Sequence, residues 1–452
     1  MRLASLLGES TRTAAPVQVP NAYVDPIACW AMLSAPLAAD IGFKVADEFA
    51  LAVVGFGVAL FAAIGALSHQ RDRVFSASVI YLMLGLMAAG ALSLLGIAPI
   101  DPIRDALLVE HITEFALIVA VFSTGLAIDR RLSWDGWRAV AGLIGIVLPL
   151  SIAAIALFGM LAMGLSLGAA IVLGAALGPT DPVLAGDVGV EAPGTPQEGD
   201  ARFNLGTEAA LNDGFAAPFV LLGIFVAGHG GTDWLAEWAA ADVLYAIVVG
   251  ALLGGGGGYV FGALAVRLRD AQMLDRRLDF YFAVPSALVV YGSAEFVGAY
   301  GLVAAFCAGV AFRRYDFEHE HNRHVYDGAE VIEKFGELVV LLLLGTMVTT
   351  GALQVPGVAG WVLAPLLLIV IRPALVMGLF ARSRMTIRER AFVAWFGVRG
   401  VAALYYAVLV VGADVLAPAE EATVFWTVAV CVMVSIVIHG LSATSAMRRM
   451  SG

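Results

Sequence analysis

The chain has 452 residues, of which 60% are hydrophobic and 14% charged, and its mean hydropathy is +0.89. Values this far above those of soluble domains exclude a soluble globular protein and predict a polytopic membrane protein. The formal net charge is -11, and the three widely separated cysteines offer neither a disulfide framework nor metal-ligand spacing, which argues against redox chemistry.

Thirteen apolar segments are predicted to cross the membrane. Most of them have the 20 or so residues that a crossing needs, and the ninth is shorter. An additional stretch, Pro26–Ile41, predicts a re-entrant or interfacial piece and not a signal peptide. No polar stretch is long enough for a separate soluble domain, so one membrane domain is expected. The predicted segments are 49–68, 74–96, 112–129, 139–163, 166–188, 207–228, 240–266, 278–297, 299–312, 335–354, 357–380, 391–412 and 422–444.

The arginines test this count, because short cytoplasmic loops carry an excess of Arg and Lys. Loops after odd-numbered segments, together with the C-terminal tail, hold twenty of the 26 basic residues, whereas loops after even-numbered segments hold Arg104 alone. A miscounted segment in mid-chain would destroy this asymmetry. The N-terminus is therefore predicted outside and the C-terminus in the cytoplasm.

The fifth segment, "LGAALGPTDPVLAGDV", places Thr180 and Asp181 between two prolines in an apolar run. Pro182 removes a backbone donor and Pro179 lies just before the pair, so the helix should unwind here. Unwound backbone is tolerated in a bilayer only where it is buried in protein or lines a cavity. In transporters such breaks form the solute site, where freed carbonyls and helix ends meet the ion.

The sixth segment carries two carboxylates, Glu208 and Asp213, at membrane depth, where each ionisable group is a functional candidate. A spacing of five residues puts them roughly 140° apart around a helix, so they cannot both face one small site. One should carry the solute and the other should pair elsewhere. Arg372 in segment eleven and Arg399 in segment twelve are the basic candidates for that pair.

The twelfth segment, "AWFGVRGVAALYYAVLV", has Gly397 and Gly400 on either side of Arg399. Glycine permits close approach or unwinding, so this is predicted to be a second broken helix. It lies in the second half of the chain at the position that the fifth segment has in the first half. Paired interruptions of this kind point to a transporter.

Four motifs in order, "GPTDPVLAGDV", "GTEAALNDGFAAPF", "IRPALV" and "GVRGVAAL", resemble those of the first family of monovalent cation/proton antiporters, the NhaP-type sodium/proton exchangers. The resemblance extends over all thirteen segments. It implies an all-α membrane protein of two inverted repeats with crossing broken helices, in segments 5 and 12, assembled as a homodimer. It also implies a dimerisation part, segments 1–3 and 7–10, and a core, segments 4–6 and 11–13. The domains expected are an extracytoplasmic tail, 1–48, the transmembrane domain, 49–444, and a cytoplasmic tail, 445–452.

By the same resemblance, Asp213 of the Asn212–Asp213 pair is the carboxylate that binds cation and proton in turn, and Thr180 is a further cation ligand. Asp181 belongs to the unwound segment, with a direct ligand role or a supporting role left open. Glu208 and Arg372 form a structural ion pair, while Arg399 lies near the second crossing. Asparagine at 212 implies electroneutral exchange, one cation for one proton.

Two departures from the family pattern concern ion coordination: Ala209 and Ser123 stand where many relatives have Ser and an acidic residue. The hydroxyls of Ser123 or Thr124, or water, are the expected substitutes. The predicted function is exchange of Na⁺ or Li⁺ for H⁺ in a bacterial inner membrane, without a cofactor, an enzymatic activity or a nucleic-acid partner. K⁺/H⁺ exchange on the same fold stays open, and a cation channel is less favoured because of the two interrupted helices.

Overall fold

A computed structural model describes residues 48–68, 76–182, 200–273, 276–315, 322–383 and 385–450. Its contacts divide the chain into two units, Met1–Ala62 and Ala63–Gly452. Most of helix α3 (Glu48–Ser68) belongs to the first unit, and all elements from α4 onward belong to the second. The predicted segment Pro26–Ile41, and the expected tail up to residue 47, lie outside the described residues.

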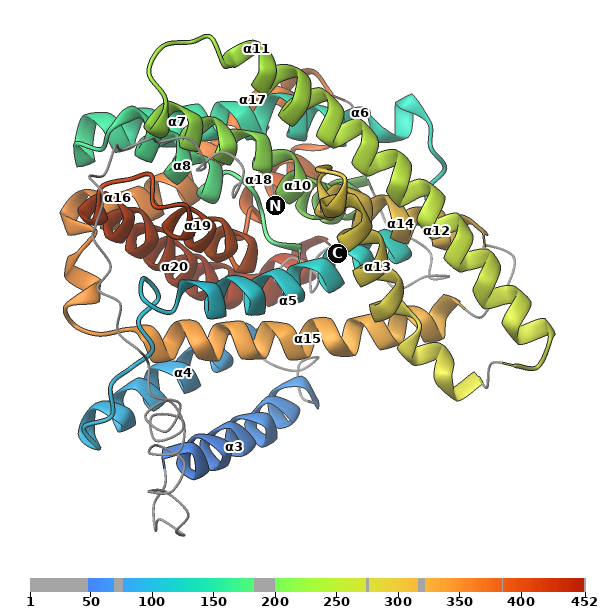
Figure 1. Cartoon of the computed structure of the whole chain (residues 1–452), viewed down its shortest axis with the longest axis horizontal. Coiled ribbons are helices and arrows are strands. Elements are labelled where there is room, and N and C mark those ends of the chain that lie inside the picture. The colour runs from blue at the N-terminus through green and yellow to red at the C-terminus, as the bar shows by residue number, and fades with distance from the viewer. Residues whose placement is uncertain are drawn as a thin grey trace, which may run out of the picture. The chain divides into compact units, whose positions relative to one another are not determined.

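Every regular element in the described residues is helical, and each of the thirteen predicted segments coincides with a helix or a broken helix (Figure 1). Seven of these helices are long and apolar enough to cross a membrane. The all-α polytopic fold is thus confirmed. From segment two to segment seven the elements are α4 (Ala77–Leu94), α5 (Ala106–Ala127), α6 (Trp134–Gly142), η2 (Leu143–Val147), α7 (Leu148–Met163), α8 (Leu167–Leu177), α10 (Asp200–Gly228), α11 (Leu235–Glu237), η3 (Trp238–Tyr245) and α12 (Ala246–Asp270).

The remaining segments follow the predicted order. The last helix continues to Met450, so residues 445–450, which were expected to form a tail, are helical. These elements are η4 (Arg276–Tyr281), α13 (Ala283–Phe296), α14 (Gly301–Tyr315), α15 (Asn322–Met347), η5 (Ala352–Gln354), α16 (Gly357–Pro365), η6 (Leu366–Ile371), α17 (Arg372–Leu379), η7 (Phe380–Arg382), α18 (Ile387–Trp395), α19 (Val401–Ala413) and α20 (Pro418–Met450).

Segments four and eleven share an unusual backbone feature. In each, a π-helical turn, η2 or η6, is followed two residues later by a proline, Pro149 or Pro373. In both halves the next segment is broken and the one after it is continuous. Because the members of each pair are seven positions apart in the order of segments, an odd number, corresponding helices run in opposite directions, as inverted repeats require.

The two predicted breaks occur where the prolines and glycines placed them. Helix α8 stops at Leu177, and residues 179–181 are not helical, while the part of segment five beyond Pro182 lies outside the described residues. Residues 396–400 separate α18 from α19. The backbone N–H of Asp181 donates to the carbonyl of Val398 at 2.9 Å, so the two breaks touch. This contact is the crossing.

Helices α5, α12 and α14 pack through glycines at backbone distance. A Cβ added at Gly254 or Gly258 of α12 would overlap the α14 backbone, and one at Gly309 of α14 would overlap the α5 backbone. Gly254 and Gly258 therefore serve tight packing of α12 against α14. Figure 1 also shows α15 lying alongside α5, which it contacts.

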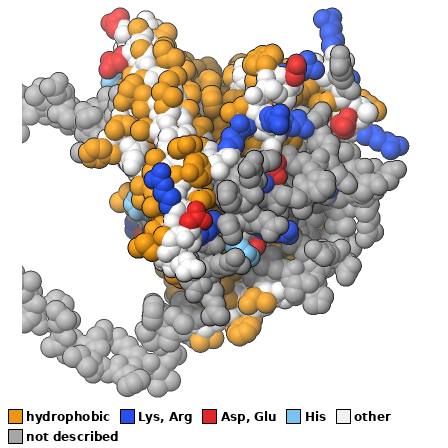
Figure 2. All heavy atoms as spheres, turned by 90° about the vertical axis from the view of Figure 1, so that its right-hand side faces the viewer, with side chains coloured by type: hydrophobic (Ala, Val, Ile, Leu, Met, Phe, Trp, Pro, Cys, Tyr) orange, Lys and Arg blue, Asp and Glu red, His pale blue; other side chains and the backbone are white. Residues whose placement is uncertain are grey.

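Large apolar side chains remain exposed on many helices, which fits a protein surrounded by lipid. Leu94, Phe296 and Val358 are 91%, 81% and 82% exposed. Figure 2 shows hydrophobic side chains forming continuous tracts over the described part of one face, with charged side chains in small groups. Apolar surface of this extent is unusual on soluble monomers and is expected where acyl chains cover it.

Candidate functional site

Helix α10 carries the predicted carrier residue and its neighbours. Thr207, Glu208, Asn212 and Asp213 are all buried, and Asp213 is 0% exposed. Glu208 and Asp213 point in different directions, as their spacing of five residues requires, and each meets a different environment.

Neither carboxylate oxygen of Asp213 accepts a hydrogen bond from any described residue. Among the described residues, the side chain that is hydrogen-bonded to Asp213 is that of Tyr406 of α19, whose hydroxyl donates to the Asp213 backbone carbonyl. The charges that act on the carboxylate are those of Asp181 and Arg399, one from each break. A buried carboxylate without donors is costly to charge, so a proton or a cation stabilises it strongly.

Asn212 links the carrier helix to the first break. Its Nδ2 donates to Thr180 Oγ1 at 2.8 Å, while its own Oδ1 accepts no hydrogen bond from a described residue. The structure thus places the Thr180 hydroxyl against the side chain of Asn212, the residue before Asp213. Oxygen atoms beside unwound backbone are the usual ligands of Na⁺ and H⁺ in transporters.

Each break places a charged side chain at the end of a half-helix that belongs to the other break. Arg399, from the second break, donates from Nε to the carbonyl of Leu177, where α8 ends, and from Nη1 to the carbonyl of Gly397 at 2.6 Å. Asp181, from the first break, accepts from the N–H of Ala402 at 3.3 Å, in the first turn of α19. The Arg399 cation therefore lies at a helix C-terminus, and the Asp181 anion lies at a helix N-terminus. Each charge is stabilised there by the helix dipole.

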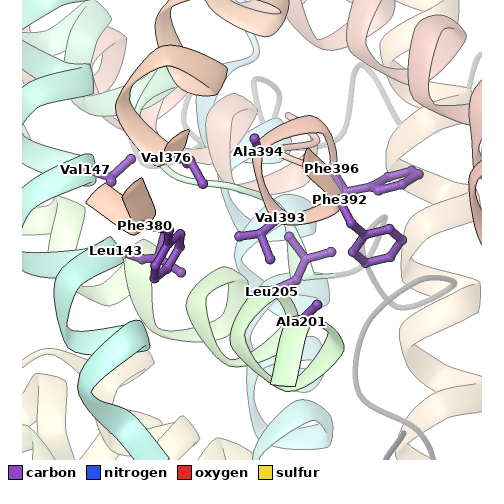
Figure 3. Close-up of a cluster of buried hydrophobic side chains, with 10 residues drawn as sticks. All are labelled: Leu143, Val147, Ala201, Leu205, Val376, Phe380, Phe392, Val393, Ala394 and Phe396. Atoms are coloured by element: carbon purple, nitrogen blue, oxygen red, sulfur yellow. The ribbon is translucent and has the colours of Figure 1, made fainter. Parts of the chain in front are cut away.

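Glu208 and Arg372 are brought together as a buried, two-pronged ion pair. Nη1 and Nη2 of Arg372 each donate to one Glu208 oxygen at 2.8 Å, and Nη2 also reaches the carbonyl of Val393 at 3.3 Å. Both side chains are at most 3% exposed. An apolar cluster on α6, η2, α10, α17 and α18 packs nearby (Figure 3), with Leu205 one turn before Glu208 and Val376 one turn after Arg372.

Gly397 is required for this arrangement in a way that the glycine pattern alone did not reveal. A Cβ at this position would overlap Cδ and Nε of Arg372, so the arginine passes directly over the backbone of the second break. The sequence predicted only unwinding here. The close approach depends on which side chain crosses the break, and only the tertiary structure decides this.

We expect Gly397→Ala to displace Arg372 and to lower both thermal stability and transport. Moving one partner of a buried ion pair out of contact with the other lowers the free energy of unfolding by an amount on the order of 3 kcal/mol. Gly378→Ala is the matched control, because a Cβ at Gly378 meets nothing within 4 Å. Thermal unfolding of the purified variants checks this, and equal melting temperatures for the two would contradict the role of Gly397.

The predicted ligands Ser123 and Thr124 have other partners. Ser123 on α5 is hydrogen-bonded to Glu333 of α15, and the Thr124 hydroxyl donates to the carbonyl of Ala120 in its own helix at 2.9 Å. No described hydrogen bond joins either hydroxyl to the residues around Asp213. Their role as cation ligands stays a prediction.

Several residues of this region were not singled out from the sequence. Tyr406 holds the Asp213 backbone, and Ser435 of α20 accepts the backbone N–H of Arg399 at 2.8 Å. Glu114 of α5 accepts from Tyr291 of α13, which is also bonded to Tyr405 of α19. The pair Tyr405–Tyr406, a polar spot in an apolar segment, was the available signal, but its partners come from three distant helices.

The fold and this site together define a secondary transporter, because buried charged and oxygen-bearing side chains gather where two interrupted membrane helices cross. The chain belongs to the sodium/hydrogen exchanger family: the family model described as "Sodium/hydrogen exchanger, transmembrane" matches residues 56–449. It is a multi-pass membrane protein of a family of transporters.

Individual relatives agree with this assignment. The chain is 29% identical over 318 residues to Na(+)/H(+) antiporter 2 of Zygosaccharomyces rouxii, covering 67% of this chain and 39% of the yeast protein. It is 25% identical over 247 residues to the K(+)/H(+) antiporter NhaP2 of Shewanella sp. (strain MR-4), covering 54% and 41%. The chain thus spans about two fifths of the length of these curated relatives.

The fold is shared with a solved structure, the sodium proton antiporter MjNhaP1 from Methanocaldococcus jannaschii at pH 8. The TM-score is 0.64 at 16% sequence identity, over 87% of this chain and all of the other. This likeness confirms the NhaP-type fold.

Proposed function

We propose that this protein exchanges Na⁺ or Li⁺ for H⁺ across a membrane, one for one, with Asp213 as the group that binds each in turn. The observation that carries the proposal is the burial of this carboxylate at the helix crossing, where neither oxygen accepts a hydrogen bond from a described residue. The family, and the activity for which the yeast relative is named, support cation/proton exchange.

Obligatory exchange follows from the cost of an uncompensated charge. With a proton or a cation bound, the Asp213 carboxylate carries no net charge and can pass between the two sides of the membrane. Without either, moving the bare anion through a low-dielectric region costs several kcal/mol. Cation and proton therefore compete for one carboxylate, and neither leaves without the other taking its place. No cofactor is needed for this cycle.

The division into a moving core and a static dimerisation part is supported by the packing of the helices. The glycine contacts among α5, α12 and α14 leave these helices no room to slide. At the crossing, by contrast, hydrogen bonds join the two breaks, which adjoin α8 and α19, to each other and to α20. The helices joined in this way can move together as one unit. We propose that segments 4–6 and 11–13 move against a homodimer built on segments 1–3 and 7–10.

The contact between Glu114, Tyr291 and Tyr405 supports a gate on the outer side. It joins α19 of the proposed core to α5 and α13 of the proposed dimerisation part. From the arginine asymmetry we propose that this end of the helices lies outside and the C-terminus in the cytoplasm. We further propose that the membrane is a bacterial inner membrane. These hydrogen bonds must break if the core moves to open Asp213 to that side.

Potassium/proton exchange is the second candidate, because the Shewanella relative is named for it. In proteoliposomes with a trapped pH-sensitive dye, Na⁺, K⁺ and Li⁺ added in turn distinguish the two. A response to Na⁺ and Li⁺ supports the proposal, and a response to K⁺ alone replaces it. A current that ignores pH would instead support a channel.

Electroneutral exchange predicts that the transport rate is unaffected by a membrane potential. The reason is that Asn212, which is neutral and bonded to Thr180, leaves Asp213 as the only carboxylate on that face of α10. A potassium gradient with valinomycin imposes the potential, and the dye signal on Na⁺ addition measures the rate. A strong dependence on the sign of the potential would show that more than one charge moves per cycle.

A further inference from the structure

An apolar cavity of about 770 Å³ lies between the helices of the proposed core and those of the proposed dimerisation part. One wall is formed by α6, η2, α7 and α10, and the other by η3, α12 and α14. Its lining is almost wholly aliphatic and aromatic, and it includes Phe215 and Phe219 of the carrier helix. The exchange cycle described above has no use for this cavity.

The dimensions of the cavity match one leaflet of a bilayer. On α14 the lining residues form a stripe that begins at Val303 and ends eleven positions later at Arg314; they are Val303, Phe306, Cys307, Val310, Ala311 and Arg314. At 1.5 Å per residue this stripe is roughly 16 Å long, about half of the ~30 Å hydrocarbon thickness. An acyl chain reaching from the membrane surface toward the midplane would follow it.

The only charged residue in the lining, Arg314, lies at one end. The arginine asymmetry makes this the cytoplasmic end, where anionic lipid headgroups are found. Arg314 is exposed and uses Nη2 to donate to the carbonyl of Arg130 at 3.0 Å, which leaves other guanidinium N–H groups without a described protein acceptor. Trp137 lines the same end, as amphipathic aromatic side chains do at membrane interfaces.

We infer that this cavity binds one acyl chain of an anionic phospholipid of the cytoplasmic leaflet, with the lipid phosphate at Arg314. The occupant contacts the helix that carries Asp213 two residues from the carboxylate, at Phe215. Beside it, a Cβ at Gly214 would overlap Val303 of α14, so the carrier helix and the opposite wall are in close contact here. A lipid held here therefore couples the composition of the membrane to movement of the carrier helix.

Photocrosslinking tests the binding itself, without any assay of transport. The full chain is reconstituted with phosphatidylglycerol that carries a diazirine in its acyl chain, and the adducts are located by peptide mass spectrometry. Adducts are expected on the α14 and α12 peptides that line the cavity. Their absence, or an even spread over all lipid-facing helices, would overturn the inference.

Two adjacent glycines of α12 provide a matched pair of variants. Gly255 lines the cavity and Gly256 does not, and a Cβ at either position meets nothing within 4 Å. Gly255→Phe should fill the cavity and abolish the α14 adducts, whereas Gly256→Phe should retain them. Equal labelling of the two variants would contradict binding in the cavity. Oxidative crosslinking of Cys307 between two chains would show instead that a second copy covers it.

The regulatory consequence rests on the proposed exchange and has its own test. The exchange rate of the unmodified protein should change with the phosphatidylglycerol content of the vesicles, and Arg314→Gln should remove this dependence. Arg323→Gln, at an exposed arginine of α15, should preserve it. Identical lipid dependence in Arg314→Gln would overturn the role of the arginine. If no exchange occurs with any cation, the proposed function fails, and the crosslinking result still decides the lipid site.

Discussion

Asp213→Asn is expected to reduce cation/proton exchange to the background of empty vesicles while the protein folds normally. Asparagine has the shape of aspartate but takes up no proton in the physiological range and carries no charge to hold a cation. Because neither Asp213 oxygen accepts a hydrogen bond within the described part of the chain, the substitution breaks none there. It also removes a buried charge, so the melting temperature should equal or exceed that of the unmodified protein.

Dye dequenching in proteoliposomes measures the exchange, and thermal unfolding in detergent measures the stability. Asp233→Asn is the control, since Asp233 lies in an exposed loop outside the site and its loss should leave both quantities unchanged. Retention of pH-driven cation flux in Asp213→Asn would refute the assignment of the carrier. Loss of both flux and folding would show that the carboxylate is structural.

Glu208→Gln is expected to have the opposite signature, a large loss of stability that brings a loss of transport with it. It leaves the Arg372 guanidinium buried and without its carboxylate, which costs about 3–5 kcal/mol. Arg372→Met should cost a similar amount, because it leaves Glu208 in the same position. Both single variants should therefore melt well below the unmodified protein.

The double variant Glu208→Gln with Arg372→Met separates a structural pair from two independent functional groups. With both charges gone no buried ion is left unpaired, so the double variant should be more stable than either single one. Thermal unfolding of the four proteins completes the double-mutant cycle. Additive losses of stability would show that the two residues are not coupled, contrary to their two-pronged contact.

Hydropathy and proline placement were enough to locate most of the fold. Long apolar runs have one stable form in a bilayer, the helix. Pro182 interrupts this helix whatever its neighbours are, and Gly397 and Gly400 permit the second interruption. For this reason the order of the helices and the positions of both breaks could be predicted. The helical angle between Glu208 and Asp213 likewise showed that the two must serve different partners.

The hydrogen-bond partners of the polar side chains around the site could not be predicted in the same way. Hydroxyls such as Ser123 and Thr124 have several acceptors within reach, and the choice depends on which helices lie beside them. Ser123 meets Glu333 of α15, some 200 positions later in the chain. The acceptor of Tyr406 and the donor to Glu114 are equally distant in sequence. No periodicity within one segment specifies such pairs.

The sequence alone determined what is local: which stretches enter the membrane, where the helices unwind, and which carboxylate stands apart from the other on α10. The direction of the stretches, taken from the arginines, stays a prediction. Only the tertiary structure decided what Arg399, Asp181 and Gly397 do. Arg399 and Asp181 each meet the end of a half-helix from the other break, and Gly397 lets Arg372 cross the backbone. The physical reason is that charge compensation and close packing are pairwise, and both partners exist only after distant helices have met.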